Sequence, residues 1–426
     1  MKRVVILCVW LFSVVAGHAQ LSLDECRRLA RENYPEIRQY DLVHQTEQYN
    51  LSNAARAWIP QLAFSAQATW QTDAPNFPKE LTGMLAQQGL EIPGLRKDQY
   101  KVALELNQTI WDGGKSVADK RIARAEAAEQ KTMTDVDLYE LEGRVDDLYF
   151  GILLLDERIA QTNLTLNLLR SNLEKVRALQ RNGVAMQSDA DVLEAELLSV
   201  GQQLIQFESS CDSYRRMLGI FIGQKVGDRK LLRPSAVQPL SGESARPELA
   251  MFAAKIDRLM AQEKMVKSSS MPRLGFFAQG YDGYPGLDYM QSMMNSDWSW
   301  NAMLGVKLSW NFGAYYTQKN NLNKLRTSRQ QVEVQRDVFL FNMNLQAAQE
   351  NGDIARLRKA IADDDRIVAL RRSVREAAES KLRNGIIDTH DLLSKITDES
   401  TASMARSMRE IELLKAIYEY KHTINR

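Results

Sequence analysis

The placement of proline is the feature that most constrains how this chain can fold. None of its ten prolines falls within residues 94–233 or 286–426, two stretches of roughly 140 residues each. Because proline breaks helix interiors, both stretches are free to be helical, and they are rich in strong helix formers. The sequence predicts long helices over 115–182 and 314–384, each ~100 Å in length. Shorter helices are expected over about 22–57 and 247–269.

The two halves of the chain repeat the same landmarks in the same order. Pro35-Glu36 returns as Pro247-Glu248, "IPQLAF" (59–64) as "MPRLGF" (271–276), and "IWDGG" (110–114) as "SWNFG" (309–313). Arg181-Asn182-Gly183 returns 202 residues later as Arg383-Asn384-Gly385. A period near 200 residues is too long for a solenoid. The pattern predicts a two-fold internal repeat, with residues 20–240 and 241–426 as copies that form one domain.

Each copy also carries two segments that alternate apolar and polar residues. The clearest is 61–70, where Leu62, Phe64 and Trp70 share one face; the others lie near 101–110, 274–281 and 302–310. These segments of ~10 residues match the strands of an outer-membrane barrel. Four strands cannot close a barrel, and an open sheet edge cannot face lipid. If these strands span a membrane, several chains must share one barrel.

The N-terminal segment predicts export of the chain, and the charge balance argues against nucleic acid as a partner. Residues 1–19 have the charged start, apolar core and small-residue cleavage site of a secretory signal peptide, and no later run is long enough to form a transmembrane helix. With 55 basic and 54 acidic side chains, the chain has no positive excess for binding nucleic acid. Cys26 and Cys211 could pair in an oxidising compartment, but spacing alone does not establish a disulfide.

No motif for catalysis or for a cofactor is found. "GGKS" at 113–116 lacks the glycine that a phosphate-binding loop needs at position 109. His44, His390 and His422 have no second histidine at ligand spacing, and neither cysteine belongs to a Cys-x-x-Cys pair. The sequence predicts no metal site, no cofactor and no enzymatic activity.

The signal peptide followed by four motifs in order, which then recur in the second half, carries a family resemblance. The series "LSLDECRRLARENYPEI", "RAWIPQLAF", "LNQTIWDGGK" and "NGVAMQSDADVLEAE", and its second copy, resembles the TolC family of outer-membrane efflux proteins. The resemblance implies a mainly α-helical homotrimer with a membrane β-barrel portion, in which four strands per chain form a shared 12-stranded barrel in outer-membrane lipid. The helices would form a tunnel across the periplasm. The implied function is a passive exit duct that works with a periplasmic adaptor and an inner-membrane pump, in tripartite efflux or type I secretion.

The repeated Arg-Asn-Gly predicts two hairpin tips, because an αL-tolerant pair after a basic helix end is a C-cap signature. Ser188 and Thr389 are expected to cap the helices that follow. By resemblance the tips gate the periplasmic entrance, with Asp391 and Asp189 forming rings of three carboxylates in a trimer and Asp388 helping to close it. The alternative is that each Asp only caps its helix.

Other tip and strand residues receive predicted roles. The tip residues expected to contact the adaptor are Gly183, Val184, Ala185, Gly385, Ile386 and Ile387. On the strands, Lys101, Glu105 and Lys307 are expected to face water inside the barrel. A second reading of the whole chain remains, namely a periplasmic structural coiled-coil protein with a small sheet and no pore.

Overall fold

The computed structural model describes residues 20–90, 92–235, 244–384 and 386–425. The expected signal peptide, the boundary at 240–241 and Gly385 lie outside them. The chain divides into two compact units. The first takes residues up to Tyr40 together with Thr132–Ala250 and Gln335–Arg426, and the second takes Asp41–Lys131 and Met251–Val334. Each unit therefore draws on both predicted repeats.

The first unit is a helical bundle. It holds α1 (Leu23–Asn33), the 3-10 turn η1 (Pro35–Arg38), α5 (Gln187–Ile222), α9 (Thr389–Ile424), and most of α4 (Lys115–Arg181) and α8 (Ala314–Arg383). The two long helices run within one residue of their expected bounds. The single helix expected over 22–57 is wrong, because Pro35 cannot donate the backbone hydrogen bond that a continuous helix needs, and it breaks the segment there.

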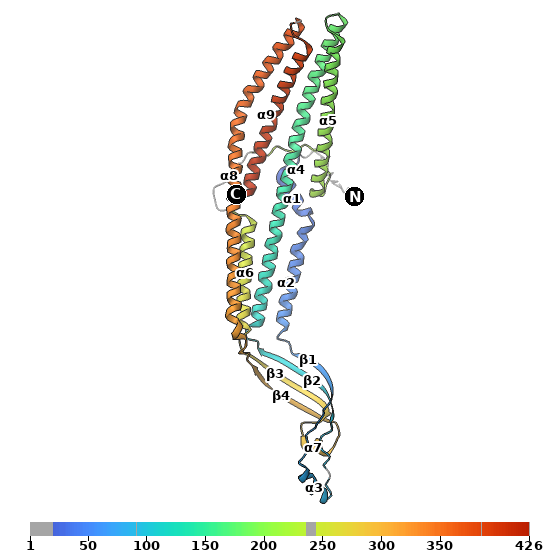
Figure 1. Ribbon diagram of the computed structural model, residues 1–426, viewed down its shortest axis with the longest axis vertical. Coiled ribbons are helices and arrows are strands. Elements are labelled where there is room, and N and C mark those ends of the chain that lie inside the picture. The colour runs from blue at the N-terminus through green and yellow to red at the C-terminus, as the bar shows by residue number, and fades with distance from the viewer. Residues whose placement is uncertain (1–19, 91, 236–243, 385, 426) are drawn as a thin grey trace, which may run out of the picture. The chain divides into compact units, whose positions relative to one another are not determined.

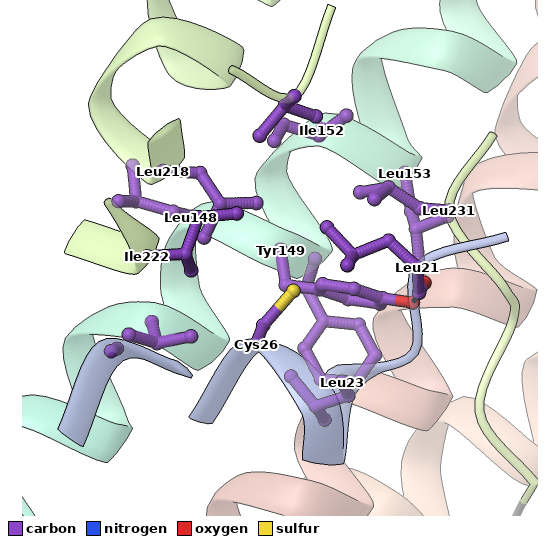
Figure 2. Packing of buried hydrophobic residues seen from close by; sticks show 14 of the residues in the cluster. Leu21, Leu23, Cys26, Leu148, Tyr149, Ile152, Leu153, Leu218, Ile222 and Leu231 are labelled. Atoms are coloured by element: carbon purple, nitrogen blue, oxygen red, sulfur yellow. Dashed lines mark hydrogen bonds between the residues drawn. The ribbon is translucent and has the colours of Figure 1, made fainter. Parts of the chain in front are cut away.

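The core of the first unit gathers where α1 meets α4 and α5. Tyr149 of α4 is buried with Cys26 of α1 and Leu218 of α5 (Figure 2). Phe150 of α4 belongs to the same buried cluster. The Tyr149 hydroxyl lies 2.8 Å from the Leu21 carbonyl oxygen and 2.6 Å from that of Leu232, so it joins two distant backbone segments. Burying each of these large side chains stabilises the fold by roughly 1.5–3 kcal/mol.

Two partly buried polar contacts fix the register of this core. The Arg27 guanidinium donates to the Asp146 carboxylate, with an Nε–Oδ1 distance of 2.7 Å, and so ties α1 to α4. Arg215 of α5 donates to Asp156 of α4 at 2.9 Å and to the Gly227 carbonyl at 2.8 Å. The guanidinium fork thereby holds the loop after α5 against the bundle.

Both cysteines of the described chain are buried free thiols. Burial raises the pKa of the Cys26 thiol to about 12, and burial also raises that of Cys211. The disulfide left open by the sequence is therefore not formed, and both side chains pack as small apolar groups.

The second unit joins a four-stranded sheet to helical segments (Figure 1). Its strands are β1 (Gln61–Trp70), β2 (Asp98–Trp111), β3 (Arg273–Tyr284) and β4 (Ser299–Ser309). They lie in the order β1-β2-β3-β4, and all neighbours are antiparallel. The helices are α2 (Gln39–Arg56), α6 (Pro247–Ser268) and the ends of α4 and α8 nearest the strands.

The register collects the apolar residues of all four strands on one face. Leu62 pairs with Leu106 and Phe64 with Leu104, while Ala278 of β3 pairs with both Leu106 and Leu304. Most of these side chains are exposed in the single chain. The predicted alternation is confirmed, with one irregularity between Thr109 and Trp111, where β2 shifts its register by a bulge.

Two short helices, which the sequence analysis did not anticipate, lie in the loops at one end of the sheet. They are α3 (Lys79–Gln87), between β1 and β2, and α7 (Tyr289–Met294), between β3 and β4. Each loop joins the two strands of one copy, so the pair extends the internal repeat. Across the described residues, no helix has an apolar stretch that is long enough to cross a bilayer.

Candidate functional site: helix tips and polar sheet face

The two tips share one backbone geometry. At the first tip, between α4 and α5, Gly183 adopts φ 74° and the Val184 N–H donates to the Leu179 carbonyl at 2.9 Å. At the second, between α8 and α9, the Ile386 N–H donates to the Lys381 carbonyl at 3.0 Å. Both bonds span five residues and close the helix end in the manner of a Schellman motif. The predicted C-cap at Gly183 is confirmed, whereas Gly385 lies outside the described residues.

The N-caps expected at Ser188 and Thr389 are wrong. The first residues of α5 and α9 are Gln187 and Thr389, so Met186 and Asp388 hold the cap positions. The helices start one or two residues earlier because the closed turn leaves only three residues between Gly183 and Gln187. Thr389 is buried, whereas Asp388 is exposed at the turn.

The three tip aspartates perform different local tasks. The Asp189 carboxylate accepts the Met186 N–H at 2.8 Å and so caps α5 from inside its first turn. At the second tip the Asp388 carboxylate does the capping, accepting the Asp391 N–H at 2.8 Å. Asp391 is exposed, and its carboxylate has no hydrogen-bond partner among the described residues. The second tip therefore presents a carboxylate that capping does not occupy.

A cluster of apolar side chains below the tips, the tip cluster, packs all four helices together. Leu169 of α4, Leu193 of α5, Ala378 of α8 and Leu392 of α9 are among its buried members. Ala185 and Ile387 pack partly against it, whereas the exposed fractions of Val184, Met186 and Ile386 are 67%, 74% and 69%. Sequence reasoning missed the exposure of Met186.

Ion pairs join the two helices of the second hairpin. Arg371 of α8 lies 2.7 Å from Asp398 of α9, Arg372 lies 3.2 Å from Glu399, and Arg375 also pairs with Glu399. Arg375 pairs with Glu379 as well; burial opposes its charge, but these hydrogen bonds outweigh burial and raise its pKa. The sequence motifs did not reveal this network. A comparison of positions 202 residues apart does point to it, because Arg375 and Glu399 replace the Leu173 and Leu197 of the first repeat.

The expected interior residues share the polar face of the sheet. Lys101 pairs with Gln67, Glu105 with Ala63, and Lys307 with Gly275, all on the side opposite the apolar residues. The Gln279 amide donates to Glu105, and the Lys101 ammonium lies 4.3 Å from the centre of the Tyr281 ring. Within the described part of the chain, no group of three or more His, Cys, Asp or Glu residues could hold a metal ion.

A family model described as outer membrane efflux protein matches residues 27–223, which run from α1 through the first tip to the end of α5. Over these residues the chain is similar to the outer membrane efflux protein family. The match confirms the expected resemblance, efflux class and outer-membrane location. No protein of curated function matches the chain in sequence.

Solved outer-membrane channels have the same fold along nearly the whole chain. The outer membrane protein VceC from Vibrio cholerae matches with a TM-score of 0.68 at 14% identity, over 94% of this chain and 95% of that one. The CmeC channel of Campylobacter jejuni gives 0.67 at 14%, over 94% and 85%. The MtrE channel of Neisseria gonorrhoeae, solved in its open state, gives 0.65 at 14%, over 94% and 88%. At such identities the likeness establishes the fold alone.

Proposed function

We propose that this protein is a passive trimeric exit duct. The observation that carries the proposal is the four-stranded sheet, whose outer strands β1 and β4 have no second partner among the described residues. Its apolar face is exposed, with Phe64 and Leu304 among the most accessible side chains. In lipid, unpaired backbone groups cost several kcal/mol each, so both edges need partners. Three copies supply twelve strands, and β4 of one chain pairs with β1 of the next.

The helical part then lies in the periplasm, and its tips act as the gate. In a trimer Asp391 forms a ring of three carboxylates, which repel one another as the opening narrows and attract cations. The free carboxylate of Asp391 supports this role, while the hydrogen bond of Asp189 favours capping at the first tip. Asp388 holds the turn on which Asp391 stands.

We further propose that the tips receive a periplasmic adaptor coupled to an inner-membrane pump. Val184 and Ile386 occupy equivalent positions in the two tips, and both expose most of an apolar side chain to solvent. Gly183 belongs to the same surface, as does Gly385 by sequence, whereas Ala185 and Ile387 are half-buried at its border. Photo-cross-linking from Val184 and Ile386 should capture an adaptor in cells. Capture only from a control position on the shaft, such as Asn167, would refute this docking site.

A cysteine experiment tests the shared barrel. Within one chain, β1 and β4 are three strand spacings apart, ~14 Å, which is too far for a disulfide. We expect Ser65→Cys, combined in turn with Asn301→Cys, Met303→Cys or Gly305→Cys, to give a covalent trimer in one register. Single-cysteine variants are the controls, since the two native thiols are buried in the other unit.

The alternative, a periplasmic structural coiled-coil protein without a pore, predicts different results. It places the chain in the soluble periplasmic fraction as a species without β1–β4 cross-links. The duct predicts the outer-membrane fraction and a heat-sensitive trimer band on gels. A soluble monomer in every fractionation would exclude the duct, because its unpaired strand edges require both lipid and partner chains.

A further inference from the structure

A groove at the ends of β2, β3 and β4, the strand-end groove, collects positive charge on the polar face of the sheet. It has a volume of about 360 Å³ and is lined by Arg273, Lys307, Ser309, Asn107, Thr109 and Asp112 among others. All of these residues belong to the second unit. They lie where β2 runs into α4, where α6 leads into β3, and where β4 leads into α8.

The register places two cations side by side in this groove. Arg273 pairs with Ser309, and Lys307 pairs with Gly275, so the two charges stand on adjacent strands two residues apart in register. Their side chains point to the same face, and both are exposed. Like charges at such diagonal positions repel, and nothing across from Lys307 offsets this, because Gly275 has no side chain.

The acidic residues of the groove are already engaged. The Asp112 carboxylate is buried and accepts the N–H groups of Gly114 at 2.9 Å and Ser116 at 2.7 Å. Asp119 lies 2.7 Å from Lys115. Among the described residues, no carboxylate lies within ion-pair distance of Arg273 or Lys307. The groove therefore presents two uncompensated cations beside the hydroxyls of Thr109 and Ser309.

We propose that the strand-end groove binds a phosphate or carboxylate group of a dissolved anion. A guanidinium recognises such a group with a planar fork, an ammonium adds a point charge, and the hydroxyls complete the donor set. The volume lies at the lower end of the range for small-molecule sites, so it has room for a small anion. The proposal rests on the proposed function in one respect, namely that the polar face of the sheet faces water. In a trimer the site occurs three times around the inner wall, as a basic belt.

Calorimetry on the purified full chain in neutral detergent, at low salt, tests the site with inorganic pyrophosphate. We expect Arg273→Gln/Lys307→Gln to weaken binding at least tenfold. Lys79→Gln/Lys97→Gln, which removes two exposed charges from the loop around α3, should bind as the parent protein does. Both pairs lie on the surface, so the heat-sensitive trimer band should persist in each. No measurable binding, or equal binding by all three proteins, would overturn the proposal.

Two further experiments distinguish a dissolved anion from a lipid headgroup, and failure of the groove from failure of the proposed duct. Binding of phosphatidylglycerol in mixed micelles without binding of pyrophosphate would also overturn the proposal, because it would place the site against lipid. In planar bilayers, pyrophosphate should reduce the current of the parent channel and not that of the groove variant. Channels without pyrophosphate binding would leave the duct intact and remove the site. Binding without any conductance would leave the site intact and remove the duct.

Discussion

The two tip hairpins share a turn, but apolar packing and ion pairs contribute to them in different proportions. In the α4–α5 hairpin the helices meet through leucines, with Leu169, Leu173 and Leu193 buried in the tip cluster. In the α8–α9 hairpin the equivalent positions are Arg371, Arg375 and Lys395. Apolar packing does not depend on charge screening and hardly depends on pH, whereas ion pairs depend on both. The α4–α5 contact, here the apolar seam, has two ion pairs, whereas the α8–α9 contact, here the ionic seam, has five among the described residues.

Because of the ionic seam, the position of α8 depends largely on charged contacts with its neighbours. Three ion pairs join α8 to α9 in the half of the hairpin nearer the tip, while Thr165 of α4 and Ser400 of α9 share a hydrogen bond of 2.6 Å. Lys175 of α4 reaches Glu379 of α8 at 3.5 Å. Changes of pH or salt in the periplasm should therefore loosen the second hairpin more than the first. The second hairpin is also the one with the free Asp391 carboxylate.

The largest effect is expected from placing charge in the apolar seam. Leu193→Lys copies the residue at the equivalent position of the second hairpin, Lys395, into a site with 0% exposure. A buried unpaired ammonium should destabilise the first hairpin by about 4 kcal/mol. Hydrogen exchange of the α5 amides near the tip measures this loss. The reciprocal Lys395→Leu should change exchange in α9 little; if both substitutions had equal effects, the distinction between the seams would fail.

A slightly smaller effect is expected from breaking the ionic seam on one side only. Arg375→Leu leaves Glu399 largely buried with a single weaker partner, Arg372, and should cost about 3 kcal/mol. Adding Glu399→Leu copies the Leu173 and Leu197 pair of the first hairpin and should restore most of the stability. Thermal unfolding of the four proteins in a double-mutant cycle gives the coupling. Equal losses in the single and double variants would show that the pair contributes nothing.

The base of the second hairpin should add a pH dependence that the first lacks. His422 of α9 stacks on Tyr139 with ring centres 4.1 Å apart, and burial lowers its pKa to about 4. The equivalent residue of α5, Ile220, is exposed and does not titrate. Because the folded pKa lies below the unfolded value of ~6.5, protons bind the unfolded chain first as pH falls. The stabilisation is complete above the unfolded pKa of ~6.5. It is lost progressively as the pH falls to about 4, the folded pKa.

Allowing for its partial exposure, His422 should account for about 2 kcal/mol of stability over this pH range. Denaturant unfolding at pH 7.5 and pH 4.5 measures the loss in the parent protein. His422→Phe keeps an aromatic ring on Tyr139 but cannot be protonated, so the loss should be smaller by this amount. An identical pH dependence in the two proteins would contradict the role of His422.

The long helices, the four strands and the tips could be predicted from sequence because each depends on local signals. The proline-free stretches contain α4 and α8, alternation marks β1, and Arg-Asn-Gly marks both turns. The ionic seam escaped because Arg375 and Glu399 are 24 residues apart, and their contact depends on how α8 and α9 face each other. The N-caps of α5 and α9 were mispredicted because the length of the turn determines where each helix begins, whatever the capping propensity of Ser188. The exposed Met186 follows from that same geometry.

The smallest structural effect, and the sharpest functional contrast, is expected from neutralising the two equivalent tip aspartates. Asp189→Asn removes the charge that caps α5 and should lower stability by about 0.5 kcal/mol, with little effect on current. Asp391→Asn disturbs no side-chain hydrogen bond, because Asp388 caps α9, and should leave stability nearly unchanged. If Asp391 forms the carboxylate ring at the entrance, its loss should raise single-channel conductance or relieve block by multivalent cations in planar bilayers. Unchanged cation block in Asp391→Asn would remove the gate from the second tip, and equal relief in both variants would remove the contrast between the two tips.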